Sequence, residues 1–176
     1  MYRIGFGCQL GGAVYRWPMV RFSSVGAVLV AAVATWGCGS KDAVTLGAKV
    51  RNVQISVEQK TLGTQLGGGF ELFLEVGAEA SGGSTVTLET FGLVRGGDTL
   101  VSPLQATPQG VTFPLTVGKG QSKTVSFVID SASLLDPATK DAICAGPVRV
   151  SGSIKDTLSG GERTPLSSSD VTPSGC

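Results

Sequence analysis

The sequence contains no histidine, and this absence restricts the chemistry open to the protein. Ser-His-Asp and Cys-His catalytic arrangements use an imidazole as general base, so both are excluded. Zinc sites built on imidazole ligands are excluded for the same reason. Lysine and arginine together number 14 against 13 aspartates and glutamates, which gives a formal net charge of +1. This balance argues against a nucleic-acid-binding protein, which normally carries a basic excess.

Tryptophan and tyrosine do not occur after Cys38, because both residues of each type precede it, as do both methionines. Five phenylalanines follow instead: Phe70, Phe73, Phe91, Phe113 and Phe127. The usual Trp or Tyr platforms of carbohydrate-binding sandwiches are therefore missing from this part of the chain. Phe73, between Glu71 and Glu75, is the remaining candidate platform, and we expect it to pack against a neighbouring strand or a second sheet. The change of composition indicates two differently built pieces that meet near residue 38.

An apolar run of ten residues, 25–34, follows Arg21. As a helix it would rise about 15 Å, roughly half of a bilayer core, which is too short for a stable membrane span. A basic start, a short apolar centre and a small-residue exit are typical of a secretory signal. We therefore expect residues 1–37 to be a signal peptide that is absent from the mature protein. Translation from Met19 would give a compact signal and is favoured, whereas translation from Met1 would give a long basic leader.

The C-terminal end of this segment contains two candidate cleavage sites. Residues 35–38, Thr-Trp-Gly-Cys, resemble the lipobox of bacterial lipoproteins, in which a small residue precedes the cysteine that receives diacylglycerol. The Gly-Cys pair matches that pattern, whereas Thr35 stands where leucine is usual and Trp36 stands where a small residue is usual. Residues 32–34, Ala-Val-Ala, form the alternative, an A-x-A site for ordinary signal cleavage after Ala34.

The cysteine count separates the two sites. Cleavage after Ala34 leaves Cys38, Cys144 and Cys176, an odd set in an oxidising compartment, whereas lipidation of Cys38 leaves an even pair. We therefore interpret the protein as a lipoprotein with an acyl (palmitate-type) anchor on Cys38. The resemblance implies a location in the bacterial cell envelope, and Gly39 after the anchor, in place of Asp, favours the outer membrane over the inner.

Residues 38–48 are expected to form the lipidated cysteine and a short tether, and from residue 49 the hydrophobic period becomes two. Apolar and polar residues alternate most clearly over residues 70–79, which predicts a half-buried strand. A shift of phase near Gly92 predicts a bulge. A helical turn after Asp136 is the one helix expected in the domain. Seven strands are predicted, around residues 53–57, 70–78, 86–93, 111–117, 125–129, 148–155 and 163–172.

Turn clusters separate most of these strands, at residues 67–69, 81–83, 96–98, 118–120 and 159–161. Short strands with regular turn spacing predict that residues 49–176 form an all-β, two-sheet antiparallel sandwich. The sandwich is similar to immunoglobulin-like domains in architecture only, because the buried Trp and the usual inter-sheet Cys pair are missing. Pro114 removes one backbone donor from its strand and predicts an edge position there.

The last two predicted strands bring Cys144 and Cys176 together. The turn at residues 159–161 lies midway between these cysteines, so an antiparallel hairpin places both at the same end. A disulfide there would close a loop of about 32 residues, worth roughly 3–4 kcal/mol from loop-closure entropy. It also requires an oxidising compartment.

Other candidate sites are weaker. Glycosidases use paired carboxylates, but three glutamates at period two fit a solvated strand face better: Glu71, Glu75 and Glu79. Residues 118–123 lack the spacing of a phosphate-binding loop and fit a tight turn. Four acidic residues in expected loops are candidate Ca²⁺ ligands but lack EF-hand spacing: Asp98, Asp136, Asp141 and Glu162. We therefore predict no catalytic residue, no metal site and no cofactor.

These observations predict a non-catalytic structural or protein-interaction module, held at the envelope by its lipid anchor, with a protein partner that the sequence does not identify. The alternative is a small-ligand or ion-binding lipoprotein with a pocket at one end of the sandwich. An apolar pocket lined by Phe91 or Phe113 would favour the alternative, whereas a filled core would favour the interaction module.

Overall fold

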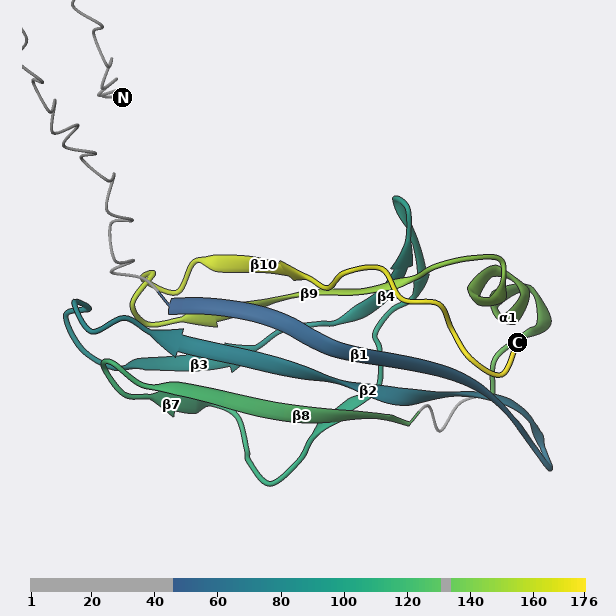
Figure 1. The fold of residues 1–176 in the computed structure, drawn as a ribbon, viewed down its shortest axis with the longest axis horizontal. Helices are drawn as coiled ribbons and strands as arrows, with labels where there is room; N and C mark the ends of the chain where they lie inside the picture. The colour runs from purple at the N-terminus through teal and green to yellow at the C-terminus, as the bar shows by residue number, and fades with distance from the viewer. Residues whose placement is uncertain (1–45, 131–133) are drawn as a thin grey trace, which may run out of the picture. The chain divides into compact units, whose positions relative to one another are not determined.

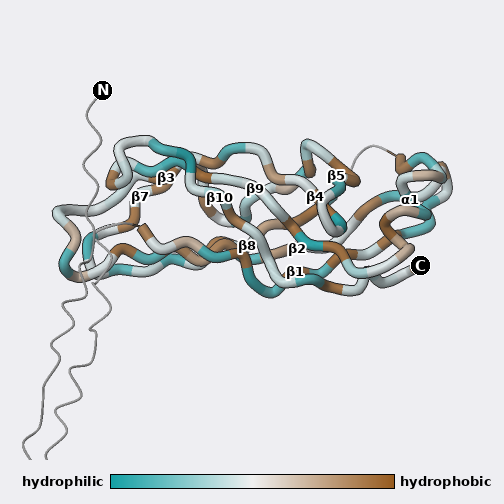
Figure 2. Tube along the Cα trace, turned by 90° about the horizontal axis from the view of Figure 1, so that it is seen from above, coloured by the Kyte–Doolittle hydropathy of each residue, from teal (hydrophilic) through white to brown (hydrophobic). Residues whose placement is uncertain are grey.

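Two antiparallel sheets face each other in the computed structural model, as Figures 1 and 2 show. The structure describes residues 46–130 and 134–176. The two facing sheets confirm the predicted all-β, two-sheet antiparallel sandwich. The predictions that fall on residues 1–45, among them the signal peptide and the anchor at Cys38, lie outside the described residues.

The first sheet contains four strands in the order β1-β2-β8-β6. They are β1 (Leu46–Lys60), β2 (Gly63–Val76), β8 (Ser122–Asp130) and β6 (Ala106–Pro108). With 15 and 14 residues, β1 and β2 are much longer than the short strands predicted. Strand β1 begins inside the expected tether, because Leu46 is buried and pairs with Val76 at the end of the ladder.

The second sheet contains six strands and has β9 at its centre. They are β3 (Ser84–Leu88), β4 (Gly92–Arg95), β5 (Asp98–Val101), β7 (Leu115–Val117), β9 (Arg149–Asp156) and β10 (Arg163–Ser167). The described residues thus form ten strands, where the sequence predicted about seven. The difference comes from β5 and β6, which were not predicted, and from one predicted strand that is split into β3 and β4.

The predicted bulge near Gly92 is confirmed by the register of β3 and β4. Both strands pair with the same edge of β9, with Leu88 opposite Ile154 and Gly92 opposite Ser151. Residues 89–91 therefore face only two residues of β9. This one-residue excess shifts the phase of the buried side chains, which is the property that defines a bulge.

The predicted turn at residues 67–69 is wrong, because these glycines lie inside β2. The hairpin turn between β1 and β2 is formed by Thr61 and Leu62 instead. Opposite the glycines, the register of β1 shifts between Arg51 and Gln54. Gly68 has a φ of +125°, and a Cβ there would lie 2.0 Å from the carbonyl oxygen of Gln54. The glycine run therefore permits a close backbone approach at a bulge rather than a reversal of the chain.

Alternating side chains from both sheets fill the core. The buried face predicted for residues 70–78 is confirmed at Phe70, Leu72, Leu74 and Val76, but Ala78 lies beyond the strand end and is exposed. The buried faces predicted for the segments of β8 and β9 are also confirmed, with Val148 lying directly before β9. Their buried residues are Val125, Phe127, Ile129, Val148, Val150 and Ile154. Figure 2 shows hydrophobic and hydrophilic residues alternating along these strands.

The helix α1 (Pro137–Cys144) confirms the predicted helical segment. Asp136 caps it, because its side chain accepts a 2.9 Å hydrogen bond from the backbone N–H of Thr139. Within the described residues, no helix has the length and apolar composition needed to cross a membrane.

The edge strands of the second sheet are short or contain proline. Strand β7 begins only at Leu115, directly after Pro114, and pairs with β3 at the end of the sheet, so the predicted edge position is confirmed. Strand β10 contains Pro165 opposite Ser153 of β9. The carbonyl of Ser153 accepts from Glu89 on the other side of β9, so the backbone of Pro165 faces away from β9. Proline at that position removes an outward donor and protects the edge against pairing.

Replacing Leu74 with alanine should lower the free energy of unfolding by about 2–5 kcal/mol, because Leu74 is fully buried between the sheets. The neighbouring substitution Glu75→Ala serves as the control, since Glu75 is exposed on the opposite face of β2, and it should change stability by less than about 0.5 kcal/mol. Denaturant unfolding of both variants measures the difference. Equal effects at the two positions would mean that the assignment of the strand faces is wrong.

Candidate functional site

The structure contains the predicted disulfide between Cys144 and Cys176, whose Cα atoms lie 5.5 Å apart. Strands β9 and β10 form the predicted antiparallel hairpin, and the pairing continues through a bridge between Val148 and Val171. Cys144 is the last residue of α1, so the bond joins the helix to the C-terminal segment of the chain. The predicted site residue Cys38 lies outside the described residues.

The three glutamates considered for glycoside hydrolysis do not form a carboxylate pair. Glu71 accepts a 2.7 Å hydrogen bond from the side-chain amide of Asn52 on β1. Glu75 is exposed on the same outer face of β2, and Glu79 lies in the loop after that strand. This arrangement is that of a solvated strand face.

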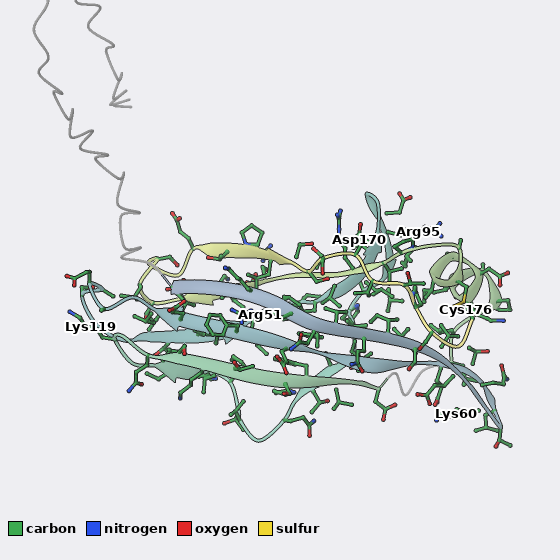
Figure 3. All side chains as sticks on the ribbon, in the orientation of Figure 1. Arg51, Lys60, Arg95, Lys119, Asp170 and Cys176 are labelled. Atoms are coloured by element: carbon green, nitrogen blue, oxygen red, sulfur yellow. A yellow bond between two sulfur atoms is a disulfide. The ribbon has the colours of Figure 1, made fainter. Side chains whose placement is uncertain are left out.

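Phe73 packs against the neighbouring strand, as expected. The guanidinium carbon of Arg51 on β1 lies 3.7 Å from the centroid of the Phe73 ring. Figure 3 shows Arg51 on β1, the edge strand of the first sheet. This cation–π contact covers one face of the ring, so that face is not open as a platform for a sugar.

The loop candidates for phosphate and calcium are used for local structure. The N–H of Gln121 donates to the carbonyl of Gly118 at 3.0 Å, which makes residues 118–121 a tight turn. Asp136 is occupied as the cap of α1, and its carboxylate also accepts a 2.6 Å hydrogen bond from the Thr139 hydroxyl. Over residues 46–130 and 134–176, no group of three or more Cys, Asp or Glu side chains is arranged to hold a metal ion.

Glu89 forms a charged cluster that the sequence did not reveal. Its carboxylate forms an ion pair with Lys155 at 2.8 Å and another with Arg163, and it accepts a 2.9 Å hydrogen bond from the Ser153 hydroxyl. Glu89 lies in the bulge between β3 and β4, so the cluster joins that segment to β9 and β10. The hydrogen bond from Lys155, followed by those from Arg163 and Ser153, lowers the pKa of Glu89 to about 2 from 4.5. The phase shift near Gly92 was the only signal in the sequence that marked this position.

Asp156 forms a second polar network, and this one is buried. Its carboxylate accepts hydrogen bonds from the Ser84 hydroxyl at 3.0 Å and from the backbone N–H groups of Leu158 at 2.9 Å and Ser159 at 3.0 Å. The network fixes the turn between β9 and β10 to the start of β3. An aspartate directly before a Ser/Gly-rich turn is a recognisable signal for such a local bond, although the sequence does not show that Ser84 joins it. Because these partners satisfy the carboxylate, the network acts as a structural element.

Four surface depressions of about 270 to 510 Å³ occur on the described part of the domain. None of the four is lined by Phe91 or Phe113. Phe91 is instead buried in the core and Phe113 is partly buried against it, and their ring centroids lie 6.2 Å and 6.1 Å from that of Phe127. Phe91 and Phe113 are thus used for packing rather than for lining one of these depressions.

No family model, no curated protein and no solved structure matches this chain.

The Glu89 cluster should make stability depend on pH in the acid range. Because the pKa of Glu89 is lowered on folding, the cluster stabilises the fold above pH 4.5, and this contribution is lost as the pH falls toward 2. We expect Glu89→Gln to lower the midpoint of thermal unfolding at pH 6, and the difference from the wild type to shrink as the pH approaches 2. Thermal melts between these pH values measure it.

Glu75→Gln is the matched control, since Glu75 lies exposed on the outer face of β2. It should leave the melting midpoint close to that of the wild type across the same range. A Glu89→Gln deficit that does not change with pH would contradict a role for the charge of Glu89.

Proposed function

We propose that the protein is a lipoprotein of the bacterial cell envelope, in which the sandwich is a non-catalytic structural or protein-interaction module. The observation that carries this proposal is the disulfide between Cys144 and Cys176. It uses two of the four cysteines and implies an oxidising compartment. Removal of the leader would then leave Cys38, in its lipobox-like context, as the single cysteine without a disulfide partner, and lipidation gives it a role.

The geometry of β1 supports a close attachment to the membrane. Seven residues, 39–45, separate Cys38 from the start of β1 at Leu46. Fully extended, they span at most roughly 25 Å. The sandwich would therefore stay near the membrane, with the start of β1 and the neighbouring loop that carries Lys119 facing it (Figure 3).

The opposite end of the sandwich would then face away from the membrane and is the expected site of partner contact. It carries α1, Cys176 and the tip of the β1–β2 hairpin (Figure 1). Because β1 runs from one end of the sandwich to the other, its strand rise places the two ends roughly 45 Å apart. Leu62 at the hairpin tip is 84% exposed, and Leu134, which approaches Gly63, is 48% exposed. Apolar side chains exposed at this end favour contact with another protein.

Structural roles for the carboxylates considered above are consistent with a non-catalytic module. The glutamates of β2 lie on a solvated face, and Asp156 is engaged by hydrogen bonds in a turn. Glu89 is held by two cations and a hydroxyl. Each of these carboxylates therefore has a structural explanation.

The anchor is tested by the intact mass of protein purified from bacterial membranes. We expect a mature chain that begins at Cys38, lacks residues 1–37 and carries a diacylglyceryl adduct. Cys38→Ala should release the protein from the membrane or stall its processing. Cys8→Ala is the control and should leave the mature mass unchanged, because Cys8 lies in the leader. An unlipidated chain that begins at Thr35 would overturn the proposal and indicate a secreted protein.

A further inference from the structure

The C-terminal segment crosses from the second sheet to the first. After the bridge between Val148 and Val171, the chain reaches the edge strand β1, where Ser174 pairs in parallel with Ser56. The N–H of Ser174 donates to the carbonyl of Ile55 at 2.9 Å, and the N–H of Val57 donates to the carbonyl of Ser174 at 2.8 Å. Residues 173–176, which we call the strap, thus satisfy backbone groups of β1 that point away from β2.

The strap fits this edge closely. Pro173 is buried. Gly175 has a φ of +77°, and a Cβ at that position would lie 2.1 Å from the carbonyl oxygen of Val57. Only glycine combines that backbone conformation with such a close approach. The contact between Gly175 and Val57, which we call the seat of the strap, is therefore specific for this segment. The disulfide between Cys176 and Cys144 holds the strap next to β1.

The disulfide includes one exposed residue, Cys176, and the strap lies outside the hydrophobic core. Cys176 is exposed at the end of the sandwich and Cys144 is half-buried (Figure 3). The core is made by side chains from both sheets, and the ladders β1–β2 and β2–β8 run without a contribution from the strap. The strap itself contributes two backbone hydrogen bonds, a hydrogen bond from the Ser174 hydroxyl to the Ile55 carbonyl and one buried proline.

We propose that the strap is a redox-sensitive cover of the β1 edge, which opens when the Cys144–Cys176 bond is reduced and closes when it reforms. The reductant is a dithiol. One of its thiolates attacks the sulfur of Cys176, which is an exposed residue. The bond to Cys144 breaks, and Cys144 leaves as a thiolate that takes up a proton. The second thiol of the reductant then releases Cys176 as a thiol and leaves the reductant as a disulfide, so that two electrons pass to the protein.

Release of the strap uncovers the carbonyl of Ile55 and the N–H of Val57 on a long edge strand. Unpaired groups of this kind accept an extended segment of another chain by strand addition. The proposal goes beyond the function proposed above, since it requires only the disulfide and the edge contact and does not depend on the lipid anchor.

Hydrogen exchange of the Val57 amide tests the proposal on the purified protein, with and without dithiothreitol. The reference is the amide of Leu72, which lies in the β2–β8 ladder and reports global opening. Reduction should raise the Val57 rate by about tenfold or more relative to the Leu72 rate, because the hydrogen bond to Ser174 is lost. Reoxidation should restore the original ratio. A Val57-to-Leu72 rate ratio that does not change on reduction would overturn the proposal, and an equal rise at both amides counts as such a result. A ratio that does not return to its original value on reoxidation would also overturn it.

A matched pair of glycine variants tests the seat without touching the disulfide. Gly175→Ala should raise the Val57-to-Leu72 ratio in the oxidised protein, because its Cβ cannot fit against Val57. Gly160→Ala also places alanine at a positive φ, +71°, but has no atom within 4 Å of the new Cβ, and it should leave the ratio unchanged. An unchanged ratio in Gly175→Ala, or an equal change in both variants, would contradict the assigned seat.

Discussion

Burial of one face of β2 against the second sheet is the constraint on which the rest of the structure depends. Phe70 stacks on Phe127 of β8 with centroids 4.7 Å apart, and its ring lies 5.3 Å from that of Phe91, in the bulge between β3 and β4. Because side chains alternate with period two, a slip of one residue would turn this whole row toward solvent. The register of β2 therefore fixes the positions of β1 and β8, and through them the seat of the C-terminal segment.

The bulges in β1 and between β3 and β4 explain what the sequence predicted and what it missed. In β1 the buried positions are Leu46 and Val50 before the bulge, but Ile55 and Val57 after it. The two halves are out of phase, so an alternating pattern was recognised only from residue 53, and residues 46–48 were assigned to the tether. The bulge near Gly92 was predictable because a strongly apolar pattern resumes in the new phase directly after it.

Long-range contacts account for the remaining differences. The glycines at 67–69 have the composition of a turn, and only their position opposite the β1 bulge shows that they permit a close approach of two backbones. Strand β6 has three residues, too few to show a period. The disulfide, in contrast, was predictable because Cys144 and Cys176 are symmetric about one local turn. Glu89 was not, since its partners come from strands that are distant in sequence.

The two ends of the sandwich carry different chemistry, and this links the proposed anchor to the disulfide. Strand β1 starts at the end that a lipidated Cys38 would hold near the membrane, whereas Cys176 lies at the other end (Figure 1). A thiol reagent or oxidoreductase in the aqueous phase would therefore reach Cys176 without competition from the bilayer. The proposed lipidation and the disulfide would both require an extracytoplasmic compartment, because cytosolic thiol pools would keep the pair reduced. The anchor would fix the location of the domain, while the redox poise at its far end would decide whether the edge of β1 is covered.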